Sequence, residues 1–228
     1  MDTDTTSLQL SPLEARILGA LIEKEITTPE YYPLTLNALL AACNQKNNRA
    51  PVLALDEETL ARGIYSLQEK RLLESFAGAN ARALKYRERL TGRLSLAPDE
   101  RAVLCELLLR GPQTGGELRS HAARMHPFNT LEEVQAALDR LAARAAGPLL
   151  AELPRQPGHK ETRFAHLLGD QPPASAELPQ TGLPPPAAMA AVMGEAARLA
   201  ALEARVASLE EEVAGLKALL HSFKAQFE

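Results

Sequence analysis

The sequence lacks the features that define secreted, membrane-spanning or disulfide-rich proteins. It contains only two cysteines, Cys43 and Cys105, among 228 residues, which are too few and too far apart for a disulfide framework or a zinc knuckle. No stretch reaches the roughly 18 consecutive apolar residues that a membrane span requires. The acidic, polar start MDTDTTSLQL does not resemble a secretory signal. We therefore expect a cytoplasmic protein without membrane contact.

A large excess of positive charge, which is common in nucleic-acid-binding domains, is also missing. The net charge is -4 at pH 7. Residues 1–92 contain 11 basic and 12 acidic side chains, residues 93–169 contain 10 and 9, and residues 170–228 contain 4 and 8. Because no segment is strongly basic, any contact with DNA has to come from local clusters of cations.

Motifs of enzymes and metal sites are missing as well. There is no phosphate loop, dinucleotide fingerprint or nucleophile elbow. His121 and His126 are five residues apart, off a single helical face, with no cysteine or carboxylate at ligand spacing. Cys105 falls within an apolar helix pattern typical of a packed thiol. We expect no enzyme activity, no metal and no cofactor, although the sequence alone leaves a catalytic pairing of Cys43 with a distant histidine open.

What the chain does contain is a helix followed at once by a β-hairpin, within residues 55–86. Asp56 is a typical N-cap, and the helix after it has an apolar stripe at helical spacing, formed by Leu60, Ile64 and Leu67. From Leu73 the pattern alternates, Gly78 and Asn80 provide turn residues, and residues 83–87 form a returning strand. A helix followed by a tight hairpin predicts the second half of a winged helix.

Two further helices are expected before this stretch. Ser11 and Glu14 form a capping box with proline at the first helical position, which predicts a helix to about Lys24. Thr35 is suited to cap a second helix that continues to about Cys43. Residues 44–51 then form a polar loop that is longer than the three or four residues of a compact helix-turn-helix.

The same plan restarts at Leu96. Six residues of the first helix recur 86 positions later, so that Leu10, Pro12, Glu14, Ile17, Leu18 and Leu21 correspond to Leu96, Pro98, Glu100, Val103, Leu104 and Leu107. Thr114 with Glu117 and Thr130 with Glu133 fit capping boxes of two later helices. Residues 149–153 and 160–166 read as two strands around a turn. The repeat predicts a second winged-helix unit.

The end of the chain changes character twice. Residues 170–186 are rich in proline and read as a linker. Apolar residues then follow a heptad pattern, with Val at position a and Leu at position d favouring a parallel dimer; the dimerisation residues are Leu199, Leu202, Val206, Leu209, Val213, Leu216, Leu220 and Phe223. Residues at g and the next e have opposite charges, in the pairs Arg198–Glu203, Arg205–Glu210 and Glu212–Lys217. The alternative is a helix that packs on its own globular part.

These patterns predict a mainly α protein with small β-hairpins. It has a disordered N-terminus (residues 1–9), two tandem winged-helix domains (10–92 and 93–169), a proline-rich linker (170–186) and a C-terminal coiled-coil helix (187–228).

Several long blocks resemble one family. The segments EKEITTPEYYPLTLNALLAACNQKNNR, LLRGPQTGGELR, RMHPF and LPRQPGHKETRFAHLL are similar to the YceH-like family of uncharacterised bacterial proteins. The resemblance covers roughly residues 10–169. It implies a fold of two tandem winged helices, and it supplies no catalytic or cofactor-binding residues.

Candidate contacts to double-stranded DNA lie on the first unit. Between Phe76 and Arg93 five cations face a single acid, Glu88, and flexible cations on a hairpin suit phosphate contacts. With the helix before the hairpin, the candidates are Arg62, Lys70, Arg71, Arg82, Lys85, Arg87 and Arg89. The alternative is a solvated strand with scattered arginines. The acidic start of that helix, residues 56–58, is unfavourable for the major groove.

In the second unit the wing cations are Arg155, His159, Lys160 and Arg163, and its third helix is again acidic. We expect this unit to serve dimer or partner contacts. Two functions therefore remain. The first is a homodimeric DNA-binding protein of transcription-regulator type. The second is a protein-interaction scaffold that uses its acidic helices and the loop at residues 44–49, since winged helices serve both purposes.

Overall fold

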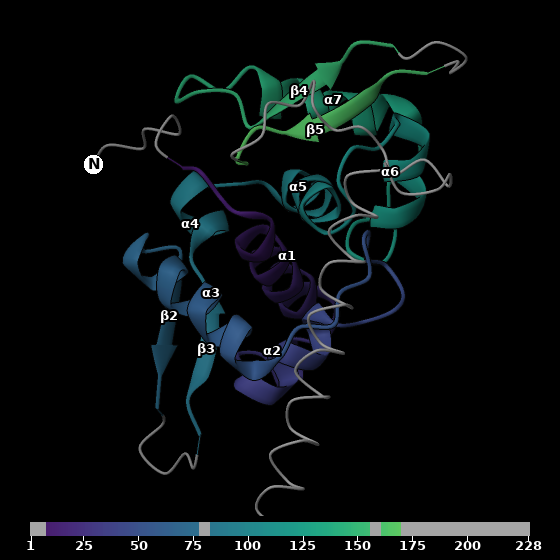
Figure 1. The fold of residues 1–228 in the computed structure, drawn as a ribbon. Helices are drawn as coiled ribbons and strands as arrows, with labels where there is room; N and C mark the ends of the chain where they lie inside the picture. Colours follow the sequence, from purple (N-terminus) through teal and green to yellow (C-terminus); the bar gives the residue numbers. More distant parts are fainter. Residues whose placement is uncertain (1–7, 78–82, 156–160, 170–228) are drawn as a thin grey trace, which may run out of the picture. The chain divides into compact units, whose positions relative to one another are not determined.

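The computed structural model describes residues 8–77, 83–155 and 161–169. Within these ranges the fold is mixed α/β, with seven α-helices and two small antiparallel sheets (Figure 1). None of the helices in this part of the chain is long and apolar enough to cross a membrane. The predicted linker, the heptad helix with its eight dimerisation residues and the N-terminal residues 1–7 lie outside the described residues.

The first three helices begin where their caps predict. Helix α1 (Pro12–Thr27) has the capping box of Ser11 and Glu14 and continues past its predicted end. After a short 3-10 turn, η2 (Pro29–Tyr31), comes α2 (Leu36–Cys43), in which Thr35 accepts a hydrogen bond from the N–H of Ala38. Helix α3 (Glu57–Glu69) is capped by Asp56. Side-chain caps therefore set these boundaries.

A hairpin follows α3. Strands β2 (Leu73–Phe76) and β3 (Lys85–Glu88) are antiparallel, and Leu73 lies opposite Glu88. The predicted returning strand thus starts two residues late and includes Glu88. A strand that the sequence did not predict, β1 (Leu34–Thr35), pairs with the other edge of β3. The predicted turn residues Gly78 and Asn80 and the candidate Arg82 lie outside the described residues.

The second half repeats the order of helices and hairpin after a short helix, α4 (Leu90–Leu94), that the sequence did not predict. The elements are α5 (Pro98–Arg110), α6 (Gly115–Ala122), α7 (Leu131–Ala142), β4 (Leu150–Leu153) and β5 (Arg163–His166). Strands β4 and β5 are antiparallel, with Leu150 opposite His166.

One of the two capping boxes in this half is complete. Thr114 and Glu117 cap each other reciprocally. The box predicted for Thr130 and Glu133 is half formed. The Thr130 hydroxyl accepts from the N–H of Glu133, but the Glu133 carboxylate accepts from the N–H of Asn129 at 2.8 Å, one residue earlier than a capping box requires.

The two halves pack on each other through α1 and α5, which lie side by side in Figure 1 and contact each other extensively. The helices approach closely at Gly19, where an added Cβ would lie 2.9 Å from Leu109 Cδ2. The Cys105 thiol donates to the Gly19 carbonyl at 3.3 Å. One hydrophobic core runs through both halves and includes Cys105, so the prediction that this thiol is packed is confirmed.

Candidate nucleic-acid interface

Two arginines of the first wing lie on either side of Glu88, Arg87 in β3 and Arg89 directly after it. Both meet an acid on the opposite strand, since Arg87 Nε donates to Glu74 Oε1 at 2.7 Å and Arg89 Nε lies 3.6 Å from Glu74 Oε2. The hydrogen bond to Glu74 raises the pKa of Arg87, whose guanidinium also lies 5.7 Å from the Phe76 ring centroid, within cation–π range. The sequence count of acids between Phe76 and Arg93 did not include Glu74, which lies across the hairpin on the other strand.

The acid that was predicted, Glu88, faces inward. It is buried, and its carboxylate accepts hydrogen bonds from the N–H of Thr91 at 2.9 Å and from the Thr91 hydroxyl. Burial raises the pKa of Glu88. The N–H of Glu88 donates to the Tyr32 hydroxyl at 2.9 Å. Glu88 therefore joins the end of β3 to the first turn of α4 and does not neutralise the arginines beside it.

Lys70, at the end of α3, already has a structural partner. Its ammonium lies 2.7 Å from Glu14 Oε2 and 2.6 Å from the Gln9 carbonyl oxygen. Glu14 is buried, and burial raises its pKa, but the hydrogen bonds from Lys70, Ser11 and Ser66 and the charge of Lys70 together outweigh that effect and lower the pKa. Ser66 donates to the same carboxylate at 2.8 Å. The capping residue of α1 is thereby fixed to the last turn of α3.

The second half contains the same connection, which supports a structural role for Lys70. Glu100, the capping glutamate of α5, lies 3.1 Å from Arg140 Nε and 3.7 Å from Arg144 Nη1. Arg140 lies in the last turn of α7 and Arg144 just after it, as Ser66 lies in the last turn of α3 and Lys70 just after it. An acid at the start of the first helix thus holds the end of the third helix in both halves.

Arg62 lies on the outer face of α3. Its side chain is 69% exposed and lies 3.7 Å from Glu58, which is also exposed. Because surface ion pairs contribute little free energy, Arg62 remains available to a ligand. Tyr65 on the same helix is 65% exposed. Asp56, with its exposed neighbours at 57 and 58, surrounds the start of α3 with negative charge.

Arg71 has an unusual backbone conformation. Its φ is 57°, in the left-handed region that non-glycine residues adopt uncommonly. The residue follows the cap of α3, where the N–H of Leu72 donates to the Leu67 carbonyl at 2.9 Å, as in a Schellman motif. The Arg71 side chain is exposed and makes no hydrogen bond or ion pair to any described residue.

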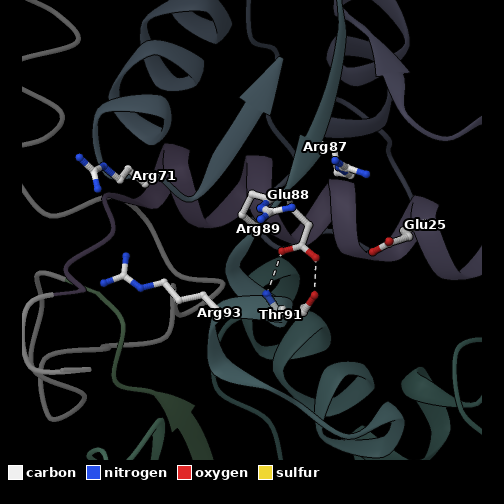
Figure 2. Close-up of a pocket in the computed structure, with 8 residues that line it drawn as sticks. Glu25, Arg71, Arg87, Glu88, Arg89, Thr91 and Arg93 are labelled. Atoms are coloured by element: carbon white, nitrogen blue, oxygen red, sulfur yellow. Dashed lines mark hydrogen bonds between the residues drawn. The ribbon is translucent and has the colours of Figure 1, made fainter. Parts of the chain in front are cut away.

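Arg71, Arg87, Arg89 and Arg93 line one cavity of about 580 Å³ at the base of the first wing. The other lining residues are Glu25, Glu88, Thr91 and Gly92. In Figure 2, Arg71 and Arg93 lie on one side of the view, and Arg87 and Glu25 lie on the other. Arg93 Nη1 is 3.4 Å from the Lys70 carbonyl oxygen, next to Arg71.

The structure thus brings three of the predicted candidates, Arg71, Arg87 and Arg89, to one cavity. It adds Arg93, which was counted in the wing but not among the candidates, and it directs Lys70 away to Glu14. Lys85 belongs to β3 and makes no ion pair to the described residues. Arg93 comes from α4, whose five residues are too short for a recognisable periodic pattern.

The second wing differs from the first. Arg163 is held by Glu117, with nitrogen–oxygen distances of 3.0 and 3.1 Å, and donates to the Pro112 carbonyl at 2.9 Å. Arg155 lines a separate cavity together with Glu152 and Glu161. His159 and Lys160 lie outside the described residues. This surface is more acidic than the cavity at the first wing.

Cys43, His121 and His126 were considered above as possible catalytic or metal-binding residues. Their contacts are those of packed structural residues. Cys43 is buried, and burial raises its pKa to about 12, so the thiol is protonated at neutral pH and is a poor nucleophile. His121 Nδ1 lies 2.6 Å from Gln113 Oε1, and the ring of His126 packs edge-on against Phe128. In residues 8–77, 83–155 and 161–169, no three His, Cys, Asp or Glu side chains are grouped to hold a metal ion.

The fold and the cavity describe a small mixed α/β protein with two repeats of one element order and an arginine-lined hollow beside the first hairpin. The chain belongs to the family described as "Protein of unknown function, DUF480", whose model matches residues 10–159. The resemblance to the YceH-like family is thus confirmed.

Relatives from several bacteria align with most of this chain. The chain is 52% identical to the UPF0502 protein of Geobacter sulfurreducens, over 96% of this chain and 98% of that protein. It is 51% identical to the UPF0502 protein of Opitutus terrae over 77% of this chain and 76% of that protein. The UPF0502 protein of Vibrio atlanticus is 47% identical over 71% and 76%, respectively.

Proposed function

We propose that this chain is a DNA-binding protein of transcription-regulator type that contacts the DNA backbone mainly through its first wing. The observation that carries the proposal is the arginine-lined cavity at the base of that wing, where Arg71 and Arg93 have no carboxylate partner among the described residues. Guanidinium groups donate paired hydrogen bonds to phosphate oxygens.

The order of the elements supports two winged-helix units, residues 10–92 and 93–169. In each unit three helices are followed by an antiparallel hairpin, and the third helix contacts the first strand of that hairpin. The first unit also has β1 on the free edge of β3. This is the arrangement in which a winged helix presents its third helix and its wing to DNA.

The charges favour backbone contact over reading of bases. The start of α3, which enters the major groove in many such proteins, carries Asp56 and two exposed glutamates. The cations lie instead at the other end of the helix and along the wing. Backbone contacts position a protein without specifying sequence, so we expect binding with modest sequence preference and strong dependence on salt.

The heptad pattern supports a homodimer through the C-terminal helix. Val and Leu at the a and d positions, from Leu199 to Phe223, form a continuous apolar seam in the sequence. A dimer would place two first wings on one DNA duplex, and the coil would set the spacing of their half-sites.

A protein-interaction scaffold is the second candidate. Exposed apolar side chains on α3 and the wing favour it, because Tyr65 is 65% exposed and Leu84 is 51% exposed. The loop at 44–49 contributes less than expected, since Arg49 is buried against Glu23 and Asn44 makes hydrogen bonds of 2.8 Å to both backbone groups of Leu55. A scaffold of this kind predicts a stoichiometric partner that survives nuclease treatment.

The test is the salt dependence of DNA binding in the full chain, measured by fluorescence anisotropy with genomic duplex fragments. Replacing Arg82, Lys85 and Arg87 with alanine should remove most of the affinity and reduce the slope of log K against log salt by about 0.9 per lost phosphate contact. Arg119→Ala, at an exposed arginine of α6, is the matched control and should bind as the wild type does.

We expect Glu74→Gln to increase the affinity for DNA in the same assay. It removes the acid that pairs with both Arg87 and Arg89, so DNA affinity should rise several-fold at low salt, where surface charges are least screened. No binding at low salt, or binding that salt does not weaken, would show the proposal to be wrong.

A further inference from the structure

We infer that the cavity at the base of the first wing is a phosphate-binding site, with Arg71, Arg89 and Arg93 as its ligands. The inference rests on the proposed function where the phosphate belongs to the DNA backbone. A phosphorylated small molecule is the other source of the same chemistry, and the experiment below separates the two.

The acids in and around the cavity are already engaged. Glu25 pairs with Arg101 at 2.6 Å, Glu88 accepts from Thr91, and Glu74 pairs most closely with Arg87. Arg87 is thus paired with Glu74, whereas Arg71, Arg89 and Arg93 have no carboxylate within hydrogen-bond distance among the described residues. The lining keeps an excess of positive charge, which favours an anion.

Three guanidinium groups keep donors free. Arg71 uses none of its five on the described residues. Arg93 uses one nitrogen, for the Lys70 carbonyl at 3.4 Å. Arg89 Nε is 3.6 Å from Glu74, which is beyond the usual length of an N–H···O hydrogen bond. A planar guanidinium donates two parallel hydrogen bonds to phosphate oxygens, so these side chains match a phosphate group.

The backbone fixes where these groups lie. Arg71 is positioned by the turn that ends α3, and Arg93 lies in α4 with its side chain tied to that same helix end. Figure 2 shows both side chains on the same side of the view. Both side chains line the cavity and neither has a carboxylate partner among the described residues, so an anion bound there would offset their positive charge.

The conformation of Arg71 is the second, independent observation. A left-handed backbone is unfavourable for a non-glycine residue, and glycine is the common residue at this position after a helix. Strain of this kind is typical of sites where a side chain has a role. At φ 57°, glycine would be more stable than arginine at position 71. The group that arginine provides there and glycine lacks is the guanidinium.

The cavity has room for more than a single oxyanion. Its volume, about 580 Å³, falls within the roughly 300–1,000 Å³ typical of small-molecule sites. Beside Gly92 the space is open, because an added Cβ would meet no atom within 4 Å. Both a DNA phosphate and a phosphorylated metabolite therefore have access.

The test uses two variants of the full chain, Arg71→Gly and Arg93→Gln, with Arg119→Gln as the matched control. Pyrophosphate is titrated by calorimetry, and DNA binding is measured by anisotropy as a function of salt. Arg71→Gly should fold at least as stably as the wild type, because the strain is relieved. Each cavity variant should weaken the binding of its phosphate ligand at least tenfold, and the control should not.

The two readouts assign the source. Loss of DNA affinity, with the salt slope reduced by about 0.9 per arginine, identifies a DNA phosphate. Loss of pyrophosphate binding with unchanged DNA binding identifies a small molecule. Pyrophosphate binding in a wild type that binds no DNA would keep the site and overturn the proposed function. DNA binding that neither variant changes, together with absent or unaltered pyrophosphate binding, would overturn the site and keep the function.

Discussion

His166, at the end of β5, has an imidazole whose Nδ1 atom is buried and has no hydrogen-bond partner among the described residues. Burial lowers the pKa of His166 to about 4, whereas an unfolded histidine has a pKa of about 6.5. Between these values the unfolded chain binds more protons than the folded chain does. The stability of the fold therefore decreases as the pH falls from about 6.5 to about 4, and this residue adds no further change below that.

We expect His166→Leu to reduce that dependence, because leucine has no proton to gain. The free energy of unfolding, measured by urea denaturation at pH 7, 5.5 and 4.5, should fall less with acidity in the variant than in the wild type. Equal losses in the two proteins would mean that His166 is not protonated on unfolding in this range.

At this scale, local chemistry was predictable and pairing across the chain was not. The caps Thr35, Asp56 and Thr114 lie within three residues of their partners, and each was predicted correctly. Glu74 was overlooked as a partner of Arg87, which is 13 residues away across the hairpin. Which side chains meet there depends on the strand register, and the sequence pattern alone did not reveal that pairing.

The partners of buried charged side chains could not be predicted from the sequence either. Glu23 in α1 pairs with Arg49 at 2.5 Å and also with Arg124, which reaches Glu106 of α5 at 2.8 Å. Burial raises the pKa of Glu23, but the hydrogen bond and charge of Arg49, together with the charges of Arg124 and Lys24, outweigh that effect and lower it. These partners come from loops after α2 and α6. The sequence gives no signal for them, since loop paths are decided by packing.

Among the elements, the long periodic helices were predicted and the shortest pieces were missed. Helices α1, α3 and α5 each have a cap and several turns of apolar spacing. Strand β1 has two residues and α4 has five, so neither is long enough to show a period. Because α4 was not predicted, Arg93 was not recognised as a candidate, although it lines the cavity.

The contact between α1 and α5 depends on a glycine. At Gly19 an added Cβ would lie 2.9 Å from Leu109 Cδ2 and 3.2 Å from Leu108 Cβ. Gly19→Val should therefore destabilise the fold by about 1–3 kcal/mol, the usual cost of overpacking a core. Gly92→Ala is the control, since its Cβ would meet nothing within 4 Å. Urea denaturation of both variants checks this, and equal stabilities would show that the helices can move apart at little cost.

For the molecule as a whole, the shared core has a consequence for assembly. Hydrophobic residues of both halves belong to one core, in which Leu21 of α1 and Leu107 of α5 are both fully buried. Residues 10–92 and 93–169 are thus expected to unfold together and not as separate domains. Because α1 and α5 bury their apolar faces against each other, we propose the heptad pattern of residues 187–228, predicted from the sequence, as the segment that joins two chains.

That assignment predicts the oligomeric state. Deleting residues 187–228 should convert a dimer to a monomer in light scattering, because the apolar seam is lost.

A pair of charge variants tests the parallel arrangement. Arg205→Glu alone should weaken the dimer by opposing Glu210 of the second chain, and adding Glu210→Lys should restore it.

The truncated monomer should also bind DNA more weakly than the dimer, because linked sites gain from a high effective concentration. If the truncated chain stays fully dimeric, the interface lies in the globular part and the two wings are spaced by that surface instead.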